Sequence, residues 1–144
     1  MKNTIFLRRL IALVVLALAG STPAFAGPAL IGNKNVAGEK LDAATLKAVF
    51  LGKKVAWDSA GRVTLAVLKG GPVAEDFLKS AVEMNASAFN NHWRRLAMTG
   101  GGTAPKSFEK EEDLRKFVAE TPGAIGFVDS VSADASVAVL TPSP

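Results

Sequence analysis

The sequence predicts an α/β domain of three layers, in which a mixed sheet is covered by helices on both faces. Segments with strand character alternate along the chain with segments of helical periodicity, and this alternation is typical of α/β folds. Two expected strands, Val63–Leu68 and Ile125–Val128, are apolar at nearly every position. A strand that is apolar on both sides fits the centre of a sheet between two helical layers.

The first 26 residues have the pattern of a secretory signal peptide. A basic start precedes an apolar run at Leu10–Ala19, and Ala24–Ala26 has the small residues of a cleavage site. The apolar run is too short to span a membrane. We therefore expect cleavage after Ala26, no stable membrane anchor, and a periplasmic protein of 144 − 26 = 118 residues. Residues 27–144 would form a single domain.

The composition argues against several classes of protein. The chain has 17 Lys and Arg and 13 Asp and Glu, but three of the basic residues belong to the expected signal peptide, which leaves 14 − 13 = +1. This small net charge removes the main support for a nucleic-acid partner. Because the sequence contains no cysteine, it has no disulfide, no thiolate metal site and no thiol for a lipid anchor.

Local signals place the first strand and the first helix. Pro28–Asn33 is a short apolar run that fits a first buried strand. The first helix should begin after Asp42, whose carboxylate can cap its amino end. It should end at Gly52, where a left-handed residue is favoured. Its buried face would carry Leu46, Val49 and Phe50.

Two helices should follow the strand Val63–Leu68. Pro72 fits the first position of the second helix, and Asn85 can cap the third, which should end at Gly100. The apolar stripe of the second helix consists of Ala74, Phe77, Leu78 and Ala81. The stripe of the third consists of Phe89, Trp93, Leu96 and Ala97.

A fourth helix should begin in the acidic run Glu109–Asp113 and stop before Pro122, with Arg115 and Lys116 towards its end. This order of charges suits the helix dipole. A weaker last strand is expected at Val137–Leu140. The fourth helix would bury Leu114, Phe117 and Val118. The large aromatic residues expected to be buried in the domain are Trp57, Phe77, Trp93 and Phe117.

The sequence offers little catalytic chemistry. His92 has no nucleophile or orienting carboxylate nearby in the sequence, so it fits the edge of a helix stripe better than a catalytic base. The run Glu109–Asp113 fits a solvated first turn better than a metal site. Gly100–Thr103 could wrap a ligand with backbone donors, although three glycines after a helix more often form a flexible exit. We therefore expect no catalytic residue, no metal and no cofactor.

Several motifs occur in the order found in one known family. They are "FLGK" at 50–53, Trp57, Phe77, Trp93, "TGGGTAPKSF" at 99–108 and "TPGAIGFV" at 121–128. Over Lys40–Val128 the chain thus resembles the phosphate-type substrate-binding proteins of ABC transporters. Such proteins have two α/β lobes that close on an anion. The resemblance implies that this chain is a single periplasmic-binding-protein-like lobe, the inserted second one, because Gly27–Lys40 has no counterpart of the other lobe.

The turn after Val63–Leu68 departs from this family. Its relatives carry a Ser-Gly-Thr segment there, and the corresponding residues here are Gly71, Pro72 and Val73. Both hydroxyls are missing, and proline has no amide N–H to donate. Glu75 and Asp76 in the first turn would also repel an anion. The residues left to bind a ligand are Lys69, Gly70, Gly71, Val73 and Ala74, with Thr103 from the glycine-rich segment.

Two hypotheses about function remain open. The first is a solute-binding protein with weakened or altered binding of a phosphate-like oxyanion, which acts with an ABC transporter permease or a partner lobe. The second is a periplasmic protein–protein interaction module that has lost small-anion binding. The overall resemblance favours the first hypothesis and the altered turn favours the second. An enzyme is the least supported class, because no nucleophile–base constellation is visible.

Overall fold

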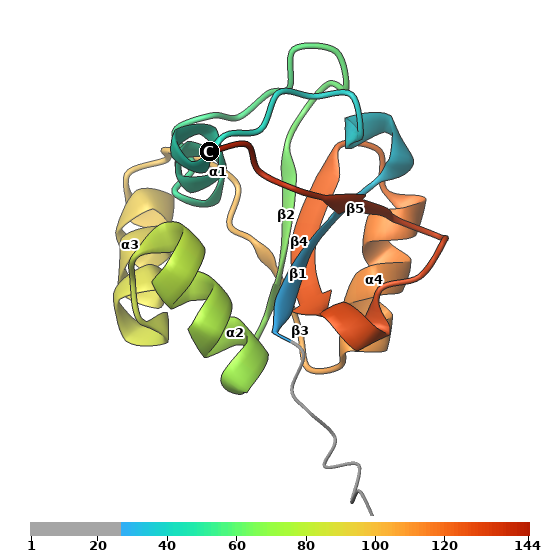
Figure 1. The fold of residues 1–144 in the computed structure, drawn as a ribbon. Coiled ribbons are helices and arrows are strands. Elements are labelled where there is room, and N and C mark those ends of the chain that lie inside the picture. The colour runs from blue at the N-terminus through green and yellow to red at the C-terminus, as the bar shows by residue number, and fades with distance from the viewer. Residues whose placement is uncertain (1–26) are drawn as a thin grey trace, which may run out of the picture.

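The computed structural model describes residues 27–144, so the signal peptide expected at residues 1–26 lies outside the described residues. Five strands form one mixed sheet with helices on both faces (Figure 1), which confirms the three-layer α/β fold. The elements are β1 (Pro28–Gly32), the 3-10 helix η2 (Lys34–Val36), α1 (Ala43–Phe50), β2 (Thr64–Leu68), α2 (Pro72–Phe77), the π-helical η3 (Leu78–Val82), α3 (Ala86–Met98), β3 (Lys106–Phe108), α4 (Glu111–Glu120), β4 (Ala124–Asp129), the 3-10 helix η4 (Ser130–Ser132) and β5 (Ala138–Leu140).

The strand order of the sheet is β3-β2-β4-β1-β5. β2 is parallel to β3 and β4, whereas β1 is antiparallel to β4 and β5. In register, Leu65 lies opposite Ile125 and Leu30 lies opposite Phe127. The carboxyl ends of β2, β3 and β4 therefore lie at one edge of the sheet, which we call the carboxyl edge. Within residues 27–144, no helix combines the length and apolar character needed to cross a membrane.

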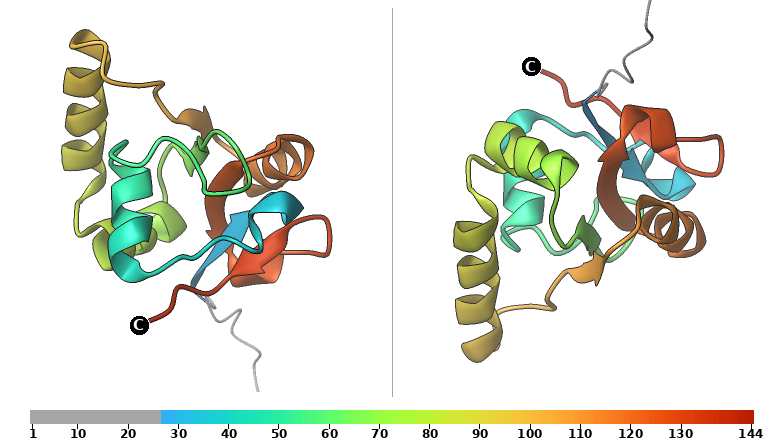
Figure 2. Two further views of the ribbon diagram at one scale, coloured as in Figure 1. Left: turned by 90° about the horizontal axis from the view of Figure 1, so that it is seen from above. Right: turned by 90° about the horizontal axis from the view of Figure 1, so that it is seen from below.

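The sheet separates two apolar clusters, because alternate side chains of a strand point to opposite faces. α1, α2 and α3 lie on one side and α4 on the other, and α3 is the outermost helix of its layer (Figures 1 and 2). On the first side, the rings of Phe77 and Phe127 stack with centroids 4.3 Å apart, and Phe50 lies 5.0 Å from Phe77. On the α4 side, the buried residues are Ile31, Ala66, Leu114, Val118, Ala124, Val128 and Val137.

Gly126, in the middle of β4, lets α4 approach the sheet closely. A Cβ atom at this position would lie 2.7 Å from the carbonyl oxygen of Ala66 and 3.0 Å from the side chain of Leu114. The contact with the backbone oxygen is too short for any side chain, and the contact with Leu114 would require that side chain to move. This glycine of the "TPGAIGFV" motif therefore has a packing role in the structure.

The expected helix ends are confirmed. Asp42 accepts a hydrogen bond from the amide of Thr45 at 2.6 Å, and Asn85 accepts one from the amide of Ala88 at 2.8 Å. Gly52, just after α1, has a φ of 75°. Its backbone also passes close to Trp93, because a Cβ atom there would lie 2.7 Å from the indole ring.

The sequence pattern does not predict β3. Of its three residues, Lys106 and Ser107 are exposed and Phe108 is half-buried. Its strand conformation comes from parallel pairing with Ala66–Leu68 of β2. The pattern also does not predict that α2 continues as the π-helical segment η3.

Three expectations about individual helix residues are wrong. Phe117 is half-buried rather than buried, because it packs against Phe108 on the edge strand, with ring centroids 5.2 Å apart. Ala97, expected in the apolar stripe of the third helix, is exposed near the end of α3. Arg115 and Lys116 lie in the middle of α4, which has no basic residue in its last turn.

Candidate functional site

The expected strand–turn–helix junction is present at the carboxyl edge. β2 ends at Leu68 and α2 begins at Pro72, with Lys69, Gly70 and Gly71 between them. Gly71 is the N-cap residue of α2 and has a φ of 95°, and no side chain caps the helix. A positive φ of this kind favours glycine over any residue with a Cβ atom. The backbone of the turn therefore favours glycine at position 71, where the resemblance of the sequence implies a serine.

Few hydrogen-bond donors remain at this turn. The amide of Lys69 donates to Phe108 across the sheet at 2.9 Å, and the amide of Glu75 donates to Gly71 at 3.1 Å. Val73 and Ala74 have the first-turn amides that lack a partner within a helix. Both residues are buried, with 9% and 1% of the whole residue exposed. An anion at this turn could therefore contact at most their two backbone amides, and these amides are little exposed.

The charges around the turn also disfavour an anion. The ammonium of Lys69 lies 3.1 Å from a carboxylate oxygen of Glu109, which follows β3 at the same edge of the sheet. Glu75 and Asp76 are exposed in α2. The one lysine expected to attract an oxyanion is thus neutralised by a neighbour that the sequence did not connect with it.

A cavity of about 310 Å³ lies beside the turn, and we call it the turn pocket. Of the candidate residues, Lys69, Gly70 and Ala74 line it, whereas Gly71 and Val73 do not. Thr103 lines a different cavity, near the amino end of β2. The structure therefore brings together only part of the expected site.

Two polar residues of the turn pocket were not expected from the sequence. They are Asn90 of α3 and Ser107 of β3. Ser107 belongs to a strand that has no recognisable strand pattern, and Asn90 is an exposed helix residue next to the buried Phe89. The motif at 99–108 was the one sequence signal that could have pointed to Ser107, and no signal distinguishes Asn90.

His92 has a structural role, in agreement with its position at the edge of a helix stripe. Its Nε2 atom donates to the carbonyl oxygen of Leu51 at 2.8 Å, and its ring packs edge-on against Trp93. The indole of Trp93 in turn donates to the carbonyl oxygen of Phe50 at 3.0 Å. These two bonds join α3 to the end of α1. Within residues 27–144, no group of His, Asp and Glu side chains has the arrangement of a metal site.

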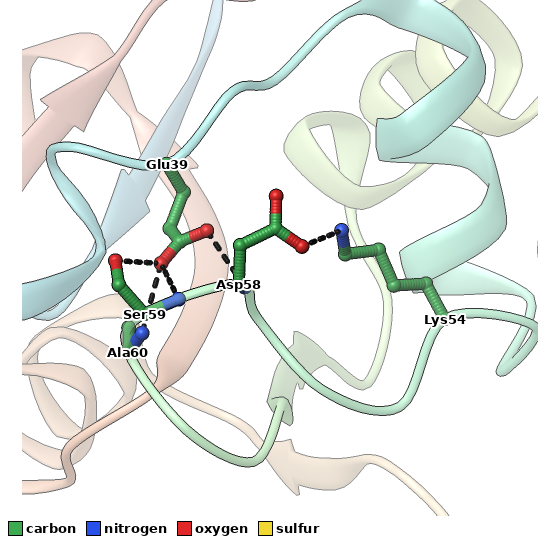
Figure 3. A network of polar contacts seen from close by, with 5 residues as sticks. All are labelled: Glu39, Lys54, Asp58, Ser59 and Ala60. Atoms are coloured by element: carbon green, nitrogen blue, oxygen red, sulfur yellow. Dashed lines mark hydrogen bonds and ion pairs between the residues drawn. The ribbon is translucent and has the colours of Figure 1, made fainter.

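One loop does bind a carboxylate with several donors, but the carboxylate belongs to the chain itself. Glu39 accepts hydrogen bonds from the amides of Asp58, Ser59 and Ala60 at 3.0, 2.8 and 2.8 Å (Figure 3). The hydroxyl of Ser59 donates a fourth bond at 2.6 Å, and it is the largest cause that lowers the pKa of Glu39 from 4.5 to about 2. This oxyanion-binding loop is therefore filled by Glu39.

The fold is that of one α/β lobe of a periplasmic binding protein. An ABC-type phosphate transport receptor from Vibrio cholerae is 12% identical with a TM-score of 0.51, and the match covers 79% of this chain and 45% of that one. A putative phosphate ABC transporter substrate-binding protein from Clostridium perfringens, solved with bound phosphate, is 18% identical with a TM-score of 0.61, and the match covers 81% and 44%.

This chain therefore spans less than half of the length of either solved structure. At these identities the comparison shows a shared fold. No protein-family model matches the sequence, and no curated protein is significantly similar to it.

Proposed function

We propose that this protein is a non-enzymatic, periplasmic component that resembles the substrate-binding subunit of a phosphate ABC transporter and provides half of an oxyanion cleft. The single observation that supports this function is the lobe fold with its strand–turn–helix junction at the carboxyl edge. A second lobe, supplied by a partner chain, would face this edge and complete the cleft. The permease of an ABC transporter is the further partner that this role implies.

Oxyanion binding by the isolated lobe should be weak. The amides of Val73 and Ala74 could form two hydrogen bonds to an anion, each with a net contribution of about 1.5 to 3 kcal/mol. Lost translational and rotational freedom costs about 4 kcal/mol or more, while a millimolar dissociation constant needs about 4 kcal/mol of net binding. The acidic groups around Lys69 make the net free energy of anion binding still less favourable. We therefore expect a dissociation constant in the millimolar range or weaker.

The test is a titration of residues 27–144 with phosphate, sulfate and molybdate at low salt. Binding is measured by calorimetry and by changes in amide chemical shifts. The shifts should be small and confined to Gly70, Gly71, Val73 and Ala74. Micromolar binding of phosphate by the lobe alone would contradict the proposal.

The ion pair at the turn allows a sharper version of this test. Glu109→Gln removes one negative charge and releases Lys69, so phosphate should bind roughly two- to fivefold more tightly, the range expected for an exposed charge pair. Glu120→Gln removes the same charge from an exposed position at the opposite end of α4 from Glu109, and it is the matched control. Equal effects of the two variants would mean that only the net charge matters and that the turn is not the site.

The second candidate function is a periplasmic interaction module without small-anion binding. The Lys69–Glu109 ion pair favours it, because it neutralises the one cation of the turn. If neither the wild type nor Glu109→Gln shows amide shifts at the turn through the millimolar range, this second function replaces the first.

A further inference from the structure

A second cavity, of about 290 Å³, lies beside the amino half of β2, at the other end of this strand from the turn. We call it the basic pocket. Its apolar wall includes Val49, Trp93 and Phe117 from three helices, and Val63 and Leu65 from β2 and the residue before it. The indole of Trp93 is held in place by its bond to Phe50 and by the close backbone of Gly52. One wall of the pocket is thus rigid.

The topology of the sheet creates this cavity. β3 pairs with β2 only over Ala66–Leu68, and in the described part of the chain no strand pairs with Thr64 and Leu65 on that side. The chain instead crosses from the end of α3 to β3 through Gly100–Pro105 (Figure 2). The space that a longer edge strand would fill is therefore left open between Trp93 on one side and Phe117 on the other.

The charged residues of the basic pocket are all cations. Lys54, Arg62 and Lys106 line it, and no carboxylate does so among residues 27–144. Lys54 pairs with Asp58 at 3.3 Å, whereas Arg62 and Lys106 form no ion pair within the described residues. The ammonium of Lys106 lies 5.9 Å from the centre of the Phe117 ring. An anion that enters the pocket would therefore meet two cations that are not neutralised.

We propose that the basic pocket binds a small amphipathic organic anion, such as an aromatic or short acyl carboxylate or sulfonate. An apolar pocket with a few polar groups is the usual form of a small-molecule site, and this volume is at the lower end of the usual range. The apolar part of the ligand packs against Trp93 and Phe117, and its anionic group lies at Arg62 and Lys106. Thr103 and the adjacent glycine backbone provide further polar contacts at the mouth.

This ligand differs in chemistry from the oxyanion proposed for the turn. Phosphate has no apolar surface to place against an indole and a phenyl ring, so the apolar wall would contribute nothing to its binding. No residue lines both the basic pocket and the turn pocket. The two proposals can therefore fail independently.

The experiment uses two fluorescent probes of similar shape, the anionic 8-anilinonaphthalene-1-sulfonate and the neutral N-phenyl-1-naphthylamine. Residues 27–144 should bind the anionic probe saturably at one site. Arg62→Gln combined with Lys106→Gln should weaken this binding at least fivefold and change binding of the neutral probe less than twofold. Both side chains are exposed, so the double variant should fold like the wild type.

Two further variants complete the test. Lys79→Gln combined with Lys110→Gln removes the same charge from exposed positions outside the pocket, and should leave binding of both probes unchanged. Ala104→Phe places a ring at the mouth of the pocket, and should weaken binding of both probes at least tenfold. Equal loss of the anionic probe in the two double variants, or unchanged binding in Ala104→Phe, would overturn the proposal.

Discussion

Replacing Phe77 by alanine should test whether the aromatic centre of the core holds the lobe together. Phe77 is 4% exposed, and its ring stacks on Phe127 at 4.3 Å and contacts Phe50 at 5.0 Å. Truncation of a buried phenylalanine typically costs about 3 to 5 kcal/mol. Two aromatic neighbours place this site towards the upper end, since each such pair contributes about 0.5 to 1.5 kcal/mol beyond the buried area.

The measurement is urea unfolding of residues 27–144, followed by circular dichroism. Phe117→Ala is the matched control. Phe117 is only half-buried beside the edge strand β3, so its truncation should lower the free energy of unfolding clearly less. A domain of this size has a free energy of unfolding of about 5 to 15 kcal/mol. The Phe77→Ala variant should therefore still show an unfolding transition unless the wild type lies at the lower end of this range. A loss below about 1 kcal/mol, or a loss equal to that of Phe117→Ala, would refute the assignment of Phe77 to the centre of the core.

Two further predictions concern the oxyanion-binding loop and the turn. Because the pKa of Glu39 is lowered from 4.5 to about 2 in the folded state, its stabilising contribution is present above pH 4.5 and is lost as the pH falls towards 2. The difference in melting temperature between wild type and Glu39→Ala should therefore be largest near pH 7 and shrink on acidification below pH 4.5; a difference that does not change with pH would contradict this. Replacing Gly71, Pro72 and Val73 by Ser, Gly and Thr should raise phosphate affinity less than tenfold, about 1.4 kcal/mol; a larger gain in the chemical-shift titration would show that the residues of the turn, and not a missing lobe, limit binding.

The parts of the fold that depend on local interactions could be predicted from the sequence. Asp42 and Asn85 cap helices three residues from their partners, and Gly52 ends a helix through its own backbone conformation. The central strands could be predicted because both of their faces are apolar. β3 could not, since its conformation comes from pairing with a strand about 40 residues earlier, as the register of Ala66 with Lys106 shows.

The candidate site was harder to predict than the fold, because it depends on contacts between distant segments. The sequence placed Thr103 with the turn residues, but the direction of α3 carries the glycine segment to the other cavity. The sequence predicted that Lys69 could bind an anion. Only the parallel pairing of β2 with β3 places Glu109 close enough to form an ion pair with it. The donors around Glu39 lie 19 to 21 residues along the chain, in a segment that shows only a turn pattern.

The turn also shows why restoring a family motif need not restore its chemistry. A serine at position 71 would have to adopt the φ of 95° that glycine adopts without strain. A threonine at position 73 would place its hydroxyl in the buried environment of Val73, a residue that is 9% exposed and belongs to an apolar cluster of the core. The three substitutions would thus add one unstrained amide, at position 72, and two hydroxyls in unfavourable positions. The backbone and packing of this turn suit Gly-Pro-Val, so under the proposed function the additional donors for an oxyanion would come from a second lobe.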